Sequence, residues 1–448
     1  MKKIIVLAAL ASVALASCTK SIPVAYDNGK DVAISFSPIS QRVGTKANVF
    51  GEQNATYTAG APTVYEDFAA WAYYTGAAST TTNPQTNSNP ANGSAFFEGV
   101  TCSHNPDDAT YEHTDYWAPT TNYYWPKAGY LHFHAMSPAV ATGTRTHTWA
   151  SGFAIDDYVA PIYTDANATG LTTDASQIDL MYSDFVFDKQ RAQYTSSTNV
   201  GTTYDDDDDD DVYVHDGVNL LFRHALSLVQ FKVKTAADYA TGTHQHKFYV
   251  RKIEVLNAYN TGDFTENRAN TANNNYAVPA DMTGKIGMYA GNEGDANGNG
   301  TGNGTPYWSD FSNEVTLTPY DVTAGAVKTG TLASNALSAQ VGTTLITLPQ
   351  ALVHTNHVQV RVTFDYQFST DSGLNWTDNL NQTLTVDLGG ANGTYQGGSA
   401  GAYTVNNWLI NHKYIYTLVF KLDPIVFDPA VVAFVTVQDI GVDLPIQS

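Results

Sequence analysis

Apolar residues recur along this chain at every second position rather than at helical spacing. Near the amino end, Val32, Ile34 and Phe36 alternate with small or polar residues, the pattern of a strand that buries one face. Alternation or a short apolar run predicts further strands at residues 64–74, 95–102, 131–136, 218–234, 247–256, 343–348, 358–368, 413–422 and 425–437. Because no segment sustains a helical pattern, we predict an all-β fold.

Long polar segments separate the predicted strands. The longest cover residues 76–94, 287–306 and 391–401, and they are dense in Thr, Asn, Gly and Pro, which predicts surface loops. The sharpest change in composition is the run of aspartates from Asp205 to Asp211. Adjacent like charges of this kind cannot be packed in a core. We therefore place a domain boundary at this run, with one domain at residues 47–211 and another at residues 212–448.

Composition and charge narrow the class of protein. The chain has 448 residues, and 43% of them are hydrophobic, which is enough to bury substantial cores. It carries 43 acidic and 22 basic side chains, for a net charge of -21. Binding of nucleic acid needs clustered Lys and Arg to neutralise phosphates, so this balance argues against a nucleic-acid partner. The shortage of charged helix formers agrees with a secreted β protein.

The amino terminus reads as an export signal. Residues 1–17 comprise a short basic start, an apolar run and small residues before a cleavage point. The Leu15-Ala16-Ser17-Cys18 sequence resembles the bacterial lipobox, in which the cysteine thiol receives a diacylglyceryl group and the signal is removed. The alternative is a secretory signal followed by an incidental cysteine. With Cys18 modified, Cys102 has no disulfide partner, and we expect it to be a small buried residue.

Several short patterns could carry chemistry, and for each of them a structural role is favoured. Gly397 to Gly401 matches G-x-S-x-G around Ser399, but no strong strand precedes it and no helix follows. Asp295 to Gly300 matches the first half of a calcium loop, yet Pro306 stands where a bidentate carboxylate is needed. The Asp205 to Asp211 run would chelate cations only diffusely. We interpret all three as loops or linkers.

Histidine pairs are a further candidate for metal binding. His132 and His134 lie two positions apart on one predicted strand, a spacing that can hold zinc, and His244 and His246 repeat it. Because Phe133 and its neighbours supply the apolar face, we expect His132 and His134 to face solvent. No third ligand is near in sequence. We therefore predict no metal site, no cofactor and no catalytic residue, and the chain is not expected to be an enzyme.

Nine strings, in order from Cys18 to Pro429, resemble the fimbrillin family of Bacteroidales, the lipoprotein precursors of type V pili. They are the lipobox at Cys18; Ile34-Ser35-Phe36 followed by Thr45-Lys46-Ala47; Phe68 to Tyr74; Tyr124-Trp125-Pro126 followed by Leu131 to Pro138; Asp179 to Tyr182; Leu221 to Ser227; Leu348-Pro349-Gln350; Trp408 with Tyr414-Ile415-Tyr416; and Ile425 to Pro429.

The resemblance implies two tandem, transthyretin-like β-sandwich domains with long polar loops, and a non-enzymatic, polymerising pilus subunit. The precursor would reach the outer membrane through lipid on Cys18. A maturation protease would then cut after Arg42 (Arg42-Val43) or after Lys46 (Lys46-Ala47), where many relatives carry Arg-Ala. Residues 18–46, the lipidated tether and first strand, would leave, and with them Val32, Ile34 and Phe36. The alternative is that both basic residues are ordinary exposed cations.

The carboxy-terminal run Ala430 to Val437 is the candidate donor strand that would fill the groove of another subunit. Its apolar members are Val431, Val432, Phe434, Val435 and Val437. The same pattern would fit a strand that ends its own domain. The resemblance further implies a stalk or tip subunit at the cell surface that supports adhesion to a receptor the sequence does not name. The competing hypothesis is a surface lipoprotein that binds glycans through exposed Trp and Tyr side chains.

Overall fold

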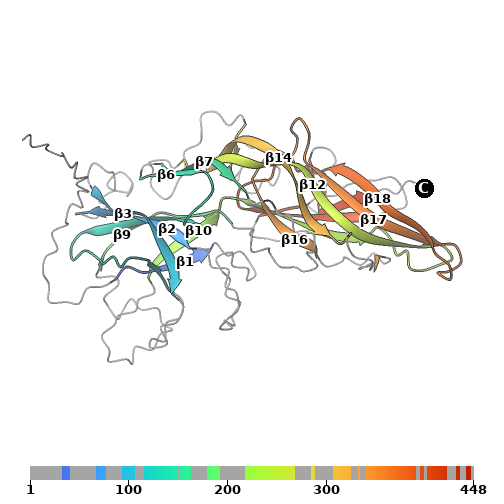
Figure 1. Cartoon of the computed structure of the whole chain (residues 1–448), viewed down its shortest axis with the longest axis horizontal. Helices are drawn as coiled ribbons and strands as arrows, with labels where there is room; N and C mark the ends of the chain where they lie inside the picture. The colour runs from blue at the N-terminus through green and yellow to red at the C-terminus, as the bar shows by residue number, and fades with distance from the viewer. Residues whose placement is uncertain are drawn as a thin grey trace, which may run out of the picture.

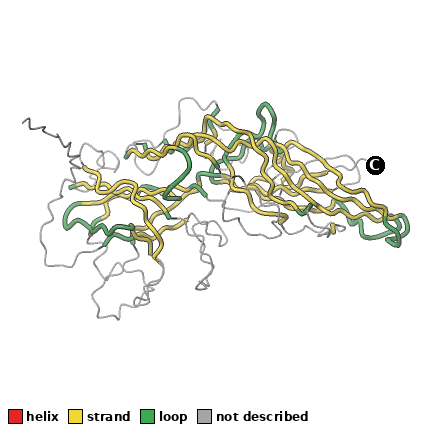
Figure 2. Tube along the Cα trace, in the orientation of Figure 1, coloured by secondary structure: helices red, strands yellow, loops and turns green. Residues whose placement is uncertain are grey.

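In a computed structural model of the chain, the described residues form an elongated all-β molecule (Figure 1). These residues are 33–40, 67–76, 93–105, 116–149, 151–160, 162, 179–191, 217–267, 284–287, 306–323, 331–332, 340–389, 394–397, 401–420, 430–433 and 440–444. Within these ranges the regular elements are strands, and no helix occurs (Figure 2). No helix that could span a membrane is found in the described part of the chain. The prediction of an all-β fold is confirmed.

Eight strands, all within residues 36–224, form an N-terminal sheet. Its members are β1 (Phe36–Ser40), β2 (Phe68–Thr75), β3 (Gly93–Asn105), β4 (Tyr116–Pro119), β5 (Tyr130–Ser137), β8 (Met181–Ser183), β9 (Val186–Lys189) and β10 (Val218–His224). The order is β2-β3-β4-β1-β10-β8-β5-β9, and β2 also pairs with β5. This extra pairing joins the sheet into a ring, so we call it the barrel. A closed barrel has no free edges around its ring.

The second half forms a two-layer sandwich. One sheet has the order β16-β11-β21-β22, with β23 also on β21. The facing sheet has the order β13-β14-β12-β17-β18, with β15 and the hairpin of β6 and β7 added at β12. Bounds are β6 (Thr144–Thr148), β7 (Gly152–Val159), β11 (Ser227–Thr235), β12 (Gln245–Thr265), β13 (Ile286–Gly287), β14 (Tyr307–Asp321), β15 (Thr331–Leu332), β16 (Gln340–Thr347), β17 (Gln359–Ser369), β18 (Thr377–Asp387), β21 (His412–Phe420), β22 (Ala430–Ala433) and β23 (Ile440–Leu444).

Strands cross between the barrel and the sandwich. The chain passes residue 211 before β10, yet β10 pairs with β1 and β8 of the barrel. The β6–β7 hairpin comes from the amino-terminal half, yet β7 pairs with the far end of β12. A third apolar cluster, which includes Phe153, Phe264 and Trp308, lies where these elements meet. The barrel and the sandwich therefore share a packed junction.

Two local predictions need correction. His132 and His134 do not face solvent, because their side chains are 1% and 0% exposed. Both faces of β5 are covered: Phe133 points into the barrel core, while Phe153 and Phe185 stack on the outward ring of His134. The predicted loop at 391–401 contains a hairpin of β19 (Thr394–Gly397) and β20 (Gly401–Thr404), and Ser399 lies outside the described residues.

Candidate functional site

Strand β1 is a central member of the barrel wall. It runs parallel to β10, with Phe36 opposite Val218 and Ser40 opposite Phe222. On its other side it is antiparallel to β4, with Phe36 opposite Trp117. The residues just before it are also bonded, since the Ile34 amide donates to the Tyr123 carbonyl at 2.8 Å. The segment 33–40 is thus held on both edges by strands that follow it far along the chain.

The inward side chains of this segment build the barrel core. Ile34 and Phe36 are 1% and 0% exposed. The Phe36 ring meets Phe68 and Phe133 edge to face, with centroids 5.7 and 5.5 Å apart. Burying two such side chains contributes roughly 3 to 6 kcal/mol. Loss of the segment would therefore leave an apolar cavity lined by aromatic rings.

Gly217 permits the close approach of β1 to β10. A Cβ at this position would lie 2.7 Å from the backbone nitrogen and carbonyl carbon of Phe36, and its φ of +65° favours glycine. The next amide, that of Val218, donates to the Ser35 carbonyl at 2.8 Å. Sequence reasoning missed this residue, although Asp216-Gly217 directly before an apolar strand is a turn signal. Gly217 is therefore the residue at which the backbones of β1 and the start of β10 come closest, and it constrains the alignment of the two strands.

Removal of β1 would open the ring between β4 and β10. Each of these strands would then present an unpaired edge beside an apolar cavity, which is the arrangement that accepts an added strand. Of the predicted leaving strand, Ile34 and Phe36 lie in the described part, whereas Val32 lies outside it. The processing candidates Arg42, Val43, Lys46 and Ala47 and the lipidation candidate Cys18 also lie outside the described residues.

The candidate donor strand is described only in part. β22, which contains Val431 and Val432, pairs antiparallel with β21, and β23 pairs parallel with the same strand farther along. Phe434, Val435 and Val437 lie outside the described residues. The pairing of β22 within its own chain matches the alternative of a strand that ends its own domain. The donor role stays a prediction.

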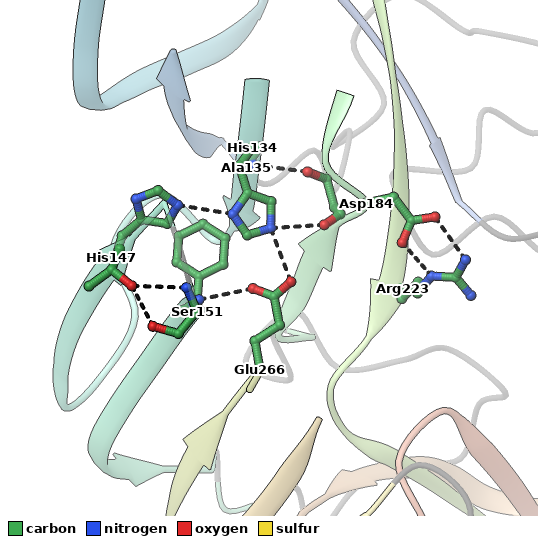
Figure 3. Close-up of polar contacts among 10 residues, drawn as sticks. His134, Ala135, His147, Ser151, Asp184, Arg223 and Glu266 are labelled. Carbon is green, nitrogen blue, oxygen red and sulfur yellow. Dashed lines mark hydrogen bonds and ion pairs between the residues drawn. The ribbon is translucent and has the colours of Figure 1, made fainter. Parts of the chain in front are cut away.

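A buried polar cluster lies at the junction (Figure 3). His134 Nε2 is 3.0 Å from the Ser183 carbonyl oxygen and 3.3 Å from Glu266 Oε1, and both are acceptors, so Nε2 must carry a proton. His134 Nδ1 lies 3.1 Å from His147 Nε2. The second carboxylate oxygen of Glu266 accepts from the Phe153 amide at 2.9 Å. Ser183 belongs to the barrel, whereas His147, Phe153 and Glu266 come from the β6–β7 hairpin and the end of β12, so the cluster connects the barrel to elements paired with the sandwich.

This cluster has a structural role rather than a catalytic one. Glu266 and His134 are fully buried, so neither is accessible to a substrate. Among the described residues, no group of three or more His, Cys, Asp or Glu side chains is arranged to hold a metal ion. The calcium-like stretch at 295–300 and the aspartates at 205–211 fall outside those residues. Two of the tryptophans in the family strings, Trp125 and Trp408, are buried and form no surface platform.

The buried position of His132 predicts that barrel stability depends on pH. Its Nδ1 accepts from the Asp188 amide at 3.1 Å, which leaves Nε2 to donate to the Thr75 hydroxyl at 2.9 Å. Burial lowers the pKa of His132 from 6.5 to about 4, although nearby Asp188 acts in the opposite direction. Between these values the unfolded chain binds the extra proton, so stability falls as pH drops from 6.5 through about 4.

We expect the loss to approach about 3 kcal/mol at the acidic end of this range. Urea unfolding between pH 7 and pH 4 measures it. His132→Gln should lower stability at pH 7 but flatten the slope. An equal slope in wild type and His132→Gln would contradict this account of His132.

Comparison with known proteins decides the family. The sequence profile of the fimbrillin-like family matches residues 66–408, most of the chain and most of the barrel and sandwich strands. The chain belongs to the fimbrillin-like family. Members of this family are structural subunits of fimbriae rather than enzymes, so this fimbrillin-like protein is a fimbrial subunit of a cell-surface appendage. No curated protein sequence matches it.

Solved structures of proteins from Bacteroides species show low similarity to this fimbrillin-like protein. A fimbrial protein from Bacteroides vulgatus is 15% identical, with 90% of this chain and 99% of that chain covered and a TM-score of 0.40. A protein assigned to cell adhesion from Bacteroides uniformis is 12% identical, with 90% and 98% covered and a TM-score of 0.40. With TM-scores this low, the assignment rests on the sequence profile.

Proposed function

We propose that this fimbrial subunit polymerises by strand exchange after proteolytic loss of β1. It is exported as a lipoprotein that carries lipid on Cys18. It then reaches the outer membrane and is cut after Arg42 or Lys46. The segment that ends with β1 then leaves, and an extended strand of another subunit takes its place. The observation that carries the proposal is the position of β1: it completes the wall of a closed barrel between β4 and β10, and it lies just before the candidate cleavage residues.

The energetics of this exchange suit a strand that can be replaced but does not fall out. The segment that ends with β1 contributes apolar burial through Ile34 and Phe36, a ladder to β10 and a single residue pair with β4. Each ladder bond adds about 0.5 to 1.5 kcal/mol net, and an empty groove loses these bonds together with the apolar burial. A donor that supplies the same ladder and the same apolar side chains restores the barrel. Stalk and tip roles are both compatible with this mechanism.

Mass spectrometry of fibres sheared from cells tests the proposal. We expect subunits that begin at Val43 or Ala47 and lack Cys18. Arg42→Ala and Lys46→Ala, made singly and together, identify the residue that is cut, and the variant that blocks processing should also block incorporation. Lys30→Ala is the matched control, because Lys30 precedes β1 and a cut there would not free the groove. Fibre subunits that retain lipidated Cys18 would overturn the proposal.

A further inference from the structure

We propose that the run from β10 to β11 transmits tension along this subunit through two parallel ladders, both of which are pulled in shear. The inference rests on the proposed function, because a subunit is pulled at both ends only when it is joined to neighbours in a fibre. In such a fibre, tension enters at the strand that occupies the β1 site and leaves through the chain that follows β21. The mechanical role follows from the direction in which each of these strands runs.

The first ladder joins the β1 site to β10. β1 runs parallel to β10, and five residue pairs connect them, from Phe36–Val218 to Ser40–Phe222. Because β10 ends at His224, next to the junction, the first residue of β1 lies at the end of the ladder that is farther from the sandwich. A strand that has the place and direction of β1, and is pulled from its first residue, is therefore drawn along β10 and away from the sandwich.

The second ladder joins β11 to β21 in the sandwich. The two strands are parallel over eight residue pairs, from Leu228–Lys413 beside the junction to Thr235–Phe420 at the far end. Tension reaches β11 from β10 at its first residue, whereas β21 is pulled beyond Phe420, its last residue. The two strands are therefore drawn in opposite directions along their common axis. Since the barrel and the sandwich lie at opposite ends of the elongated molecule, this pull stretches it lengthwise (Figure 1).

The connection between β10 and β11 has no slack. Ala225 and Ser227, which lie in it, are fully buried. On the barrel side, the Ala225 amide donates to the Leu180 carbonyl at 2.8 Å. On the sandwich side, Trp308 Nε1 donates to the Ala225 carbonyl and the Ser227 hydroxyl donates to the Leu409 carbonyl, both at 2.7 Å. Tension on β10 therefore passes to β11 without first straightening a loop.

The direction of pulling decides how much force a ladder withstands. When two strands are drawn apart along their axis, all the hydrogen bonds of the ladder share the pull and must break together. When one end of a strand is pulled away from its partner, each bond in turn bears the whole pull. Forced separation is governed by the barrier to unfolding, so the higher barrier of shared loading gives a higher force. The ladder at β1 has five pairs against eight at β21, so it should yield first.

Pulling single molecules between cysteine handles tests the inference. The protein is the uncut chain from residue 18 onward, in which β1 occupies its own groove, so the measurement does not depend on fibre assembly. Handles at Cys18 and at Lys421→Cys, directly after β21, load both ladders in shear. The matched protein carries Cys18→Ser and Ser40→Cys, so that the same pull starts at the last residue of β1 and peels it from β10. Cys102 is buried and does not compete for the handles.

The first event should lengthen the chain by roughly 100 Å, the extended length of the residues between β1 and β2. With the handle at Cys18, this event should require at least about twice the force that it requires with the handle at Ser40. Both proteins should unfold at the same urea concentration, so the difference in force reports the direction of pulling. Equal forces from the two handles, or a first event in the sandwich, would overturn the inference. Either result would leave the proposed function intact, because that depends on the subunits recovered from sheared fibres.

Discussion

Removal of β1 should raise the reactivity of the Cys102 thiol by at least about a hundredfold, because a thiol in a closed core reacts only when the structure opens. Cys102 is 0% exposed and belongs to the same apolar cluster as Phe36. It lies on β3 and pairs with Phe68 on β2 and Pro119 on β4, the strand that becomes an edge when β1 leaves. Burial and nearby Asp67 raise the pKa of the thiol, which slows the reaction further in the closed barrel.

The measurement is the rate of alkylation of a protein in which Cys18 is replaced by serine, so that Cys102 is the sole thiol. Intact protein sets the slow reference and urea-unfolded protein the fast one. Protein cut between Ser40 and Asp67 and stripped of β1 should approach the fast rate, and adding a peptide of residues 33–40 should restore protection. If the stripped barrel shielded Cys102 as well as the intact protein does, the groove would not open, and strand exchange at β1 would lose its physical basis.

Local patterns in the sequence predict single strands well but not their partners. The alternation of Ile34 and Phe36 correctly indicates a buried face, since both side chains lie in the barrel core. Their partner β10 begins 182 residues after Phe36, and no local signal encodes a parallel pairing over that separation. The same limit applies to Gly217, whose importance depends entirely on the strand that passes over it.

Strands whose side chains are mostly exposed escape a search for apolar alternation. β18 (Thr377–Asp387) consists largely of Thr, Asn, Gln and Asp and is exposed along most of its length, so it lacks the pattern of a half-buried strand. For His132 and His134 the sequence pattern errs in the other direction, because alternation on β5 predicts one solvent-exposed face. That face is buried because Phe153 and Glu266, from the β6–β7 hairpin and the end of β12, cover it. Burial by distant segments is invisible in a short window of sequence.

Glu266→Gln should destabilise the junction by about 3 kcal/mol, since replacing one oxygen of a buried carboxylate by an NH₂ group leaves buried polar groups without matched partners. One carboxylate oxygen of Glu266 accepts from the Phe153 amide at 2.9 Å, and the other lies 3.3 Å from His134 Nε2. Glutamine offers one acceptor and one donor group in the same volume. Whichever way its amide turns, an N–H group faces another N–H group, because the Ser183 carbonyl keeps the proton on His134 Nε2.

Urea unfolding followed by tryptophan fluorescence, to which Trp308 of the junction cluster contributes, measures this loss. Glu98→Gln is the matched control, because Glu98 is exposed on β3 and the same change there should alter stability by less than about 0.5 kcal/mol. A Glu266→Gln protein as stable as the Glu98→Gln protein would mean that the His134–Glu266 pair does not hold the junction. Loss of stability confined to Glu266→Gln would show instead that the buried carboxylate of Glu266 stabilises the junction between the barrel and the sandwich.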